Sequence, residues 1–413
     1  MKLTIHRGIN QIGGCITEIQ SSSGMKILID LGHNLPDGGG LAEDEYDVPE
    51  NLDRLLDGVS AVFYTHYHGD HIAFEAAVAK KGINQYLGDI AKKIKMQFYA
   101  HMKNTRNEEN REKYEAAFEA VRTFSKYRSG RTVSVGDINV TPYYVSHSAA
   151  DAYMFVIECD GKSVLHTGDF REHGYLGHCL SGTLKKYVVK RNIDILITEG
   201  TTLSRDDERM MSEKDLQQKA YELMSRYKYA FVLCSSTDLD RLASFYQATF
   251  RHQGRLFVAD GYQCKLLKTF TDKLGYKIPE YDFKNPHEYD KALQPLMLES
   301  GFTMLVRRSA KFKAWLEALM PLLPENGTVF IYSQFKGYIT EGSPAYSHEA
   351  DEFVHSYGWK FEYLHTSGHA SKDTIAKVCR LVNPHSILLR SGFTSTDCHI
   401  SSSGMRPYCA EIF

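Results

Sequence analysis

The stretch FYTHYHGDHI, residues 63–72, places His66, His68, Asp70 and His71 within six consecutive positions, directly after an apolar run. Alternate residues of an extended strand point to the same side, so His66 and His68 can converge on one ion. The glycine that follows marks a turn, which would bring Asp70 and His71 round to a neighbouring point. Imidazole and carboxylate ligands together suit Zn²⁺ and, less selectively, Mn²⁺ or Fe. The stretch therefore predicts a metal centre at the end of a strand.

Further motifs follow at other places in the chain. The glycine-rich start GINQIGGCITEI (residues 8–19) is followed by Asp30 in ILIDLG, His147 in VSHSAADAY and Asp169 in LHTGDF. With H-x-H-x-D-H, this order resembles the metallo-β-lactamase fold, an α/β fold built as an αββα sandwich. The resemblance implies two ions: one held by His66, His68 and His147, and one held by Asp70, His71 and Asp169. Asp169 would bridge both, and Asp30 would orient a ligand without itself binding metal.

Two such ions supply hydrolytic chemistry. Ions about 3.5–4 Å apart can share a hydroxide and clamp both oxygens of an in-line displacement. Zn²⁺ lowers the pKa of its water to roughly 7, so no protein nucleophile is needed.

The pattern of apolar and polar residues changes at about residue 205. Strand-like and helix-like segments then alternate, which predicts βαβ units and a parallel, Rossmann-like sheet. An insertion of this kind between Asp169 and the end of the chain resembles the β-CASP branch, typified by ribonuclease J, in which it forms a nucleic-acid channel. We expect a metallo-β-lactamase domain over 1–204, the inserted β-CASP domain over 205–360, and a return to the first domain over 361–413, with an atypical tail. Before the insertion, we expect strands up to residue 65 and helices within 84–127.

Two acidic and histidine motifs match the same branch. Glu199 in ITEGTTL corresponds to its acidic motif, and His369 in HTSGHAS (residues 365–371) to its histidine motif. The resemblance assigns catalytic roles to Asp70, Glu199 and His369, with His369 steadying the scissile phosphate or assisting proton transfer. We expect His365 to be structural, and Ser371 to cap a following helix.

Four hydroxyl side chains lie at strand-to-helix turns of the predicted insertion: Ser235, Ser236, Thr237 and Ser333. They could hold substrate phosphates, or they could simply cap helices, and the sequence leaves both alternatives open.

The resemblance fails after His369. The branch carries a further metal-binding histidine about twenty residues later, but the strand SILL ends in Arg390-Ser391. His385 precedes that strand and would lie at its wrong end, and His399 could reach only if the tail folds back. We therefore expect the second ion to bind more weakly than the first.

Composition limits the remaining alternatives. The 413 residues are 43% hydrophobic and 24% charged with a net charge of −2, which is typical of a globular protein without a basic excess. No signal peptide, membrane span or CxxC pair is expected, so we predict reduced cysteines and a cytoplasmic location. We predict a zinc-dependent ribonuclease that binds RNA and no membrane, with Mn²⁺ as an alternative metal and a homodimer left open. A small-molecule hydrolase (thioesterase, lactonase or lactamase-like) and an RNA-binding relative with weakened catalysis are the alternatives.

Overall fold

The computed structural model describes residues 1–35, 43–104, 107–203 and 210–390. The chain falls into two compact units. The first consists of Met1–Glu172, Leu176–Glu208 and Gly368–Phe413, and the second of His173–Tyr175 and Arg209–Ser367.

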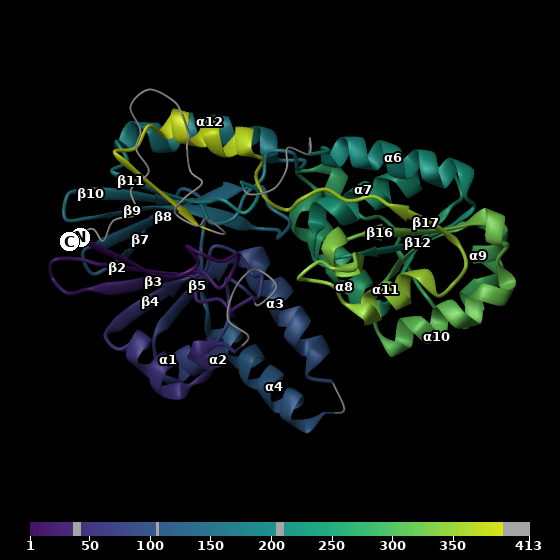
Figure 1. Ribbon diagram of the computed structural model, residues 1–413, viewed down its shortest axis with the longest axis horizontal. Helices are drawn as coiled ribbons and strands as arrows, with labels where there is room; N and C mark the ends of the chain where they lie inside the picture. The colour runs from purple at the N-terminus through teal and green to yellow at the C-terminus, as the bar shows by residue number, and fades with distance from the viewer. Residues whose placement is uncertain (36–42, 105–106, 204–209, 391–413) are drawn as a thin grey trace. The chain divides into compact units, whose positions relative to one another are not determined.

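The first unit is built on two six-stranded sheets (Figure 1). The first sheet contains, in spatial order, β1 (Lys2–Arg7), β2 (Ile16–Gln20), β3 (Lys26–Ile29), β4 (Val59–Phe63), β5 (Asn84–Gly88) and β6 (Ser125–Tyr127). The second contains β18 (Ser386–Arg390), β11 (Ile195–Glu199), β10 (Lys162–His166), β9 (Ala152–Cys159), β8 (Ile138–Val145) and β7 (Val133–Val135). Apolar side chains of both sheets, such as Ile29 and Phe63 from one and Phe155 and Ile197 from the other, form one buried cluster. The two sheets therefore pack face to face around a shared core.

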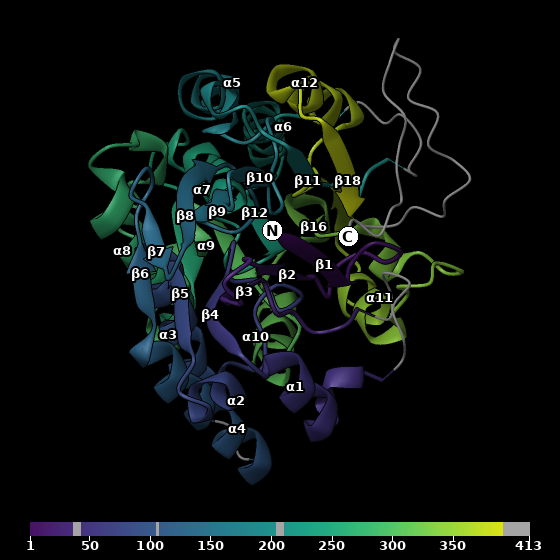
Figure 2. The ribbon, with the colours of Figure 1, turned by 90° about the vertical axis from the view of Figure 1, so that its left-hand side faces the viewer.

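Helices cover the outer faces of this sandwich (Figures 1 and 2). The first sheet carries α1 (Pro49–Leu56), α2 (Glu75–Lys80), α3 (Asp89–Met102) and α4 (Glu108–Thr123). The second carries α5 (Leu180–Thr183) and α12 (Lys372–Val382). In α12, Ile375, Val378 and Val382 recur at helical spacing and join the buried cluster on the outer face of the second sheet. The unit is thus an αββα sandwich, as predicted.

The second unit has a single parallel sheet. Its spatial order is β14 (His287–Glu288), β13 (Leu256–Ala259), β15 (Phe302–Val306), β12 (Tyr229–Cys234), β16 (Thr328–Ser333) and β17 (Lys360–Tyr363). The helices are α6 (Glu213–Arg226), α7 (Leu239–Phe250), α8 (Gly261–Phe270), α9 (Gln294–Ser300), α10 (Ala310–Leu319) and α11 (His348–His355). Every residue of the central strand β12 is buried, because helices cover both faces of the sheet, α6 and α7 on one side and α10 and α11 on the other (Figure 1).

Local sequence signals account for several element boundaries. The Ser212 side chain accepts a hydrogen bond from the Asp215 amide, and the Asp215 carboxylate accepts one from the Ser212 amide, so α6 begins with a capping box. Ser371 caps α12 as predicted, accepting from the Thr374 amide.

Other expectations were wrong. Residues 49–56 form α1 inside the region predicted to be strands only, because Pro49 starts a helix that buries three leucines. The helices of residues 84–127 are flanked by β5 and β6, which are too short to show a period. The expected domain boundary at 360/361 falls inside β17, which pairs in parallel with β16, so the second unit continues to Ser367.

The sequence also led to expectations about membrane spans and cysteines. No helix in the described ranges has both the length and the apolar character that crossing a membrane requires. The six cysteines of those ranges are free thiols. Cys398, Cys409 and His399, with the rest of the predicted atypical tail, lie outside the described residues.

Candidate metal centre

The candidate site lies where several strands of the first unit end. Strand β10 pairs in parallel with β11, β11 pairs in parallel with β18, and β9 is antiparallel to both β8 and β10. Strands β8, β10, β11 and β18 therefore run in one direction and end at one edge of the sheet. The side chains at these ends are His147 after β8, Asp169 after β10, Glu199 at the end of β11 and Arg390 at the end of β18. The loop after β4 contributes His66, His68, Asp70 and His71.

Three histidines form the best ligand set. One nitrogen each of His66, His68 and His147 lies within 4.8 Å of the others. Burial lowers the pKa of His68 to about 4 and the pKa of His66 and His147 well below the usual range. All three imidazoles are therefore neutral at physiological pH, which is the form that binds metal.

The hydrogen bonds of these rings leave the right atoms for a metal. His147 Nδ1 donates to the Gly368 carbonyl at 2.7 Å, so its Nε2 lone pair remains, 3.2 Å from His68 Nδ1. His66 Nε2 is buried and has no hydrogen-bond partner among the described residues. A buried nitrogen without a partner is costly, and a metal ion would satisfy it. The three residues therefore fit a tetrahedral Zn²⁺ with one open position.

Asp30 holds the neighbouring histidine, as the resemblance implies. Its carboxylate accepts from His71 Nδ1 at 2.8 Å and from the backbone and hydroxyl of Thr65 at 2.7 and 2.9–3.0 Å. The Thr65 hydroxyl also lies 3.1 Å from His66 Nδ1. One fully buried carboxylate therefore fixes the orientation of His71 directly and of His66 through Thr65.

The residues expected at a second ion also lie close together. His71 Nε2 is 3.1 Å from Asp169 Oδ2 and 3.7 Å from Asp70 Oδ2. Burial by itself would lower the pKa of His71, but the carboxylates of Asp169, Asp30 and Asp70 outweigh it and raise the pKa well above the usual range. His66, His71 and Asp169 can offer ligand atoms to one point, whereas Asp70 belongs to no such set of three.

His369 and Glu199 form a pair beside these ligands. His369 Nδ1 is 2.8 Å from Glu199 Oε2 and 3.6 Å from Asp169 Oδ2. The other Glu199 oxygen accepts from the Phe170 amide at 2.7 Å and the Ala370 amide at 3.3 Å. Glu199 is fully buried, whereas the His369 side chain is 24% exposed. Glu199 is thus a fixed carboxylate that orients a more exposed imidazole.

The predicted phosphate-binding residues belong to the second unit. Ser235 is exposed, Ser236 and Thr237 are partly exposed, and the cap of α7 is Asp238, whose side chain accepts from the Arg241 amide. The alternative that these three hydroxyls cap the helix is therefore wrong, and phosphate binding by them stays a prediction.

Ser333 has a different environment. It is buried, accepts from Arg241 Nη1 at 2.6 Å and donates to the Leu364 carbonyl at 2.5 Å. The same guanidinium donates to His365 Nδ1 at 2.9 Å, so His365 has the structural environment that we expected. Phosphate binding by Ser333 would compete with these bonds.

Some contributors to the site were given no role in the sequence analysis. Thr65, Gly368 and Arg390 contact the predicted residues only because distant strands come together. Gly32 is a fourth case, since a Cβ there would lie 1.7 Å from the Asp70 carbonyl oxygen and 2.6 Å from the His71 nitrogen. The residue after Asp30 and Leu31 must therefore be glycine for the metal-binding loop to approach β3.

Gly32→Ala should weaken metal binding. Because the new methyl group meets backbone rather than a flexible side chain, the loop has to move, and its ligands move with it. We expect zinc affinity to fall by about tenfold or more, as is typical when groups that orient metal ligands are lost. Competition with a fluorescent zinc chelator measures the zinc affinity of each variant.

Gly69→Ala is the matched control, since Gly69 lies in the same loop and a Cβ there meets nothing within 4 Å. Its zinc affinity should stay close to that of the original protein. Equal affinities of the two variants would contradict the role assigned to Gly32.

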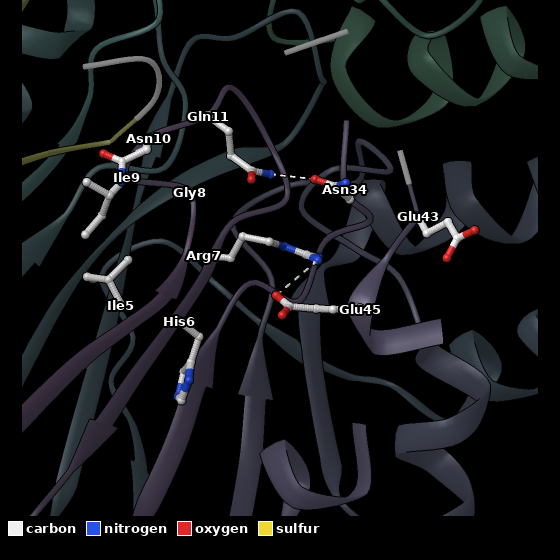
Figure 3. A pocket seen from close by; sticks show the side chains of 10 residues that line it. All are labelled: Ile5, His6, Arg7, Gly8, Ile9, Asn10, Gln11, Asn34, Glu43 and Glu45. Carbon is white, nitrogen blue, oxygen red and sulfur yellow. Dashed lines mark hydrogen bonds and ion pairs between the residues drawn. The ribbon is translucent and has the colours of Figure 1, made fainter. Parts of the chain in front are cut away.

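A separate pocket of about 290 Å³ lies beside the glycine-rich start of the chain (Figure 3). Gln11 donates to Asn34 across it, and Arg7 reaches toward Glu45. None of the predicted site residues lines it. This pocket is therefore distinct from the candidate metal centre.

Comparison with known proteins agrees with the fold. The family model Lactamase_B_2, a beta-lactamase superfamily domain, matches residues 26–231. The chain therefore carries a metallo-β-lactamase superfamily domain, a fold that implies a divalent metal and agrees with a metal-dependent hydrolase.

Two curated relatives are nucleases. The chain is 26% identical to ribonuclease J of Helicobacter pylori (strain ATCC 700392 / 26695) over 179 residues, which are 41% of this chain and 23% of that protein. It is 26% identical to exodeoxyribonuclease WalJ of Streptococcus pneumoniae serotype 2 (strain D39 / NCTC 7466) over 196 residues, 46% of this chain and 64% of that protein. The matches thus span less than two thirds of either relative. A protein of unknown function from Enterococcus faecalis V583 shares the fold over 94% of this chain and 93% of its own, with a TM-score of 0.66 and 20% identity.

Proposed function

We propose that the chain hydrolyses phosphodiester bonds in single-stranded RNA, using a divalent metal ion. The similarity to ribonuclease J and to exodeoxyribonuclease WalJ supports nucleic acid as the substrate class. The observation that carries the proposal is the His369–Glu199 pair beside the three-histidine cluster.

That pair suits a phosphodiester because a leaving ribose oxygen needs a proton or a hydrogen-bond donor. Glu199 is fixed by two backbone amides and binds Nδ1 of His369, so a substrate oxygen would meet Nε2. The carboxylate also stabilises the protonated imidazole. We assign His369 as a catalytic residue and Glu199 as its positioning residue.

His66, His68 and His147 would hold the ion. A bound Zn²⁺ or Mn²⁺ would polarise a phosphoryl oxygen and lower the pKa of an attacking water. Asp70 would accept the proton of that water, because its side chain is 18% exposed whereas those of Asp30, Asp169 and Glu199 are at most 5% exposed. Our proposed catalytic set is thus Asp70 and His369.

Metal removal tests this proposal. Protein treated with a chelator and then dialysed should lose at least about 100-fold in the rate of cleavage of a labelled single-stranded RNA, because a metal ion contributes several kcal/mol of transition-state stabilisation. Zn²⁺ or Mn²⁺ should restore the rate, and gel analysis of timed samples measures it. The exposed His385 offers a matched control, since His385→Ala should cleave at the original rate.

The same assay compares substrates. Single-stranded DNA of equal sequence tests the sugar, and nitrocefin, a thioester and a lactone test the small-molecule alternative, which the net charge of −2 favours. Metal-restored turnover of a small molecule without turnover of RNA would contradict the proposal. RNA that binds but is not cut at saturating metal would point to a relative with weakened catalysis.

A further inference from the structure

Arg390 occupies an unusual place in the first unit. It is the last residue of β18 and pairs in register with Glu199, the last residue of β11. This is the strand end at which the resemblance leads us to expect a metal-binding histidine. Arginine cannot bind a metal there, because its guanidinium stays protonated.

The guanidinium is enclosed by the site. Arg390 is 1% exposed, and its Nη2 lies 3.6 Å from Asp169 Oδ1. Its Nε, Nη1 and Nη2 have no hydrogen-bond partner among the described residues. Burying a cation without hydrogen bonds is unfavourable unless negative charges surround it.

Negative charges do surround it. Burial by itself would lower the pKa of Arg390, but the Cys15 sulfur and then the carboxylates of Asp169, Asp30 and Glu199 raise it above the usual value. These three carboxylates are themselves almost fully buried. Without Arg390, a second divalent ion would be needed to neutralise these carboxylates.

The first and second expected ion positions differ in the charge that surrounds them. The first is built from three neutral histidines and includes the buried His66 Nε2, which lacks a partner among the described residues. The second depends on Asp169, whose other oxygen is already close to His71 and whose Oδ1 faces a fixed positive charge. A second cation on Asp169 would be repelled by that charge.

We propose that Arg390 supplies the positive charge of the second-ion position, so that the chain binds one divalent ion, at His66, His68 and His147. The inference rests on the metal dependence of the proposed function, but not on its substrate. Arg390 thereby acts as a positioning and charge-neutralising residue for Asp169.

Metal counting tests the inference without reference to activity. The full chain, equilibrated with a small excess of Zn²⁺ and then desalted, is analysed by plasma mass spectrometry. We expect one zinc per chain in the original protein and in Arg390→Lys, which keeps the charge. We expect two in Arg390→His, which removes the charge and adds an imidazole at the strand end.

Arg390→Gln provides a second test, which applies even if Arg390→His does not fold. It removes the charge without adding a strong ligand, and Mn²⁺ titration followed by electron paramagnetic resonance should show a second site at least tenfold tighter than any in the original protein. Thermal denaturation confirms that each variant is folded.

Two tightly held ions in the original protein would overturn the inference, including the case in which His399→Ala removes one of them. An unchanged count in Arg390→His together with an unchanged titration in Arg390→Gln would also overturn it. One ion per chain without RNA cleavage would contradict the proposed function alone.

Discussion

Asp70→Ala should lower RNA hydrolysis by about 10²–10⁴-fold while the protein still binds one zinc per chain. Asp70 is the most exposed of the four carboxylates at the site and lies on the loop that carries His68 and His71. Among the residues that the structure describes, it belongs to none of the sets of three that could hold an ion. Its removal therefore deletes a proton acceptor and leaves the three-histidine cluster intact.

Steady-state rates with labelled RNA and metal analysis of the same preparation measure both quantities. The glycine-rich start contributes to the position of Asp70, since a Cβ at Gly13, where φ is +73°, would lie 2.6 Å from its Oδ2. Asp57→Ala is the control, because Asp57 is an exposed aspartate at the end of α1. A variant at Asp70 that loses its zinc together with its activity would contradict a role in proton transfer and favour a role as ligand.

Arg241→Met should destabilise the second unit by about 3–5 kcal/mol, the cost of leaving a buried partner charge without its counterion. Arg241 and Glu213 are 1% and 0% exposed and form a bidentate pair at 3.0 and 3.3 Å. The guanidinium also donates to Ser333, His365 and the Thr366 carbonyl. The variant removes every one of these bonds at once.

Urea denaturation followed by fluorescence and far-ultraviolet circular dichroism measures the loss. Arg226→Met is the matched control, since Arg226 is exposed in the last turn of α6, and its effect should stay within about 0.5 kcal/mol. The double variant Arg241→Met with Glu213→Leu should recover most of the stability, because both charges are then absent. A single variant as stable as the original protein would show that the network contributes little.

The site could be predicted from the sequence where its residues are neighbours in the chain. His66, His68, Asp70 and His71 follow one strand within a few residues, so their proximity follows from strand and turn geometry. His147, Asp169, Glu199 and His369 were placed by the order of their motifs. The structure brings the first three to strand ends at one edge of the sheet, and His369 lies beside them in the segment before α12. Their catalytic and metal-binding roles stay proposals.

The fold, like the site, could be predicted where a local pattern in the sequence was strong. Long periodic segments such as α4 were expected, whereas β5, β6 and β17 were missed, because they are short and carry polar, partly exposed residues instead of an apolar run. The end of the second unit was misplaced for the same reason, since β17 belongs to its sheet.

The sequence by itself determined the class of fold, the candidate residues of the first ligand set and the absence of a histidine at the end of β18, because these depend on residue type and local spacing. Only the tertiary structure decided what Arg390 does in that position. Its charge lies buried near Asp169 because β18 pairs with β11, almost two hundred residues away in the chain. Desolvation and the nearest opposite charge are set by neighbours in space, and no local pattern encodes them.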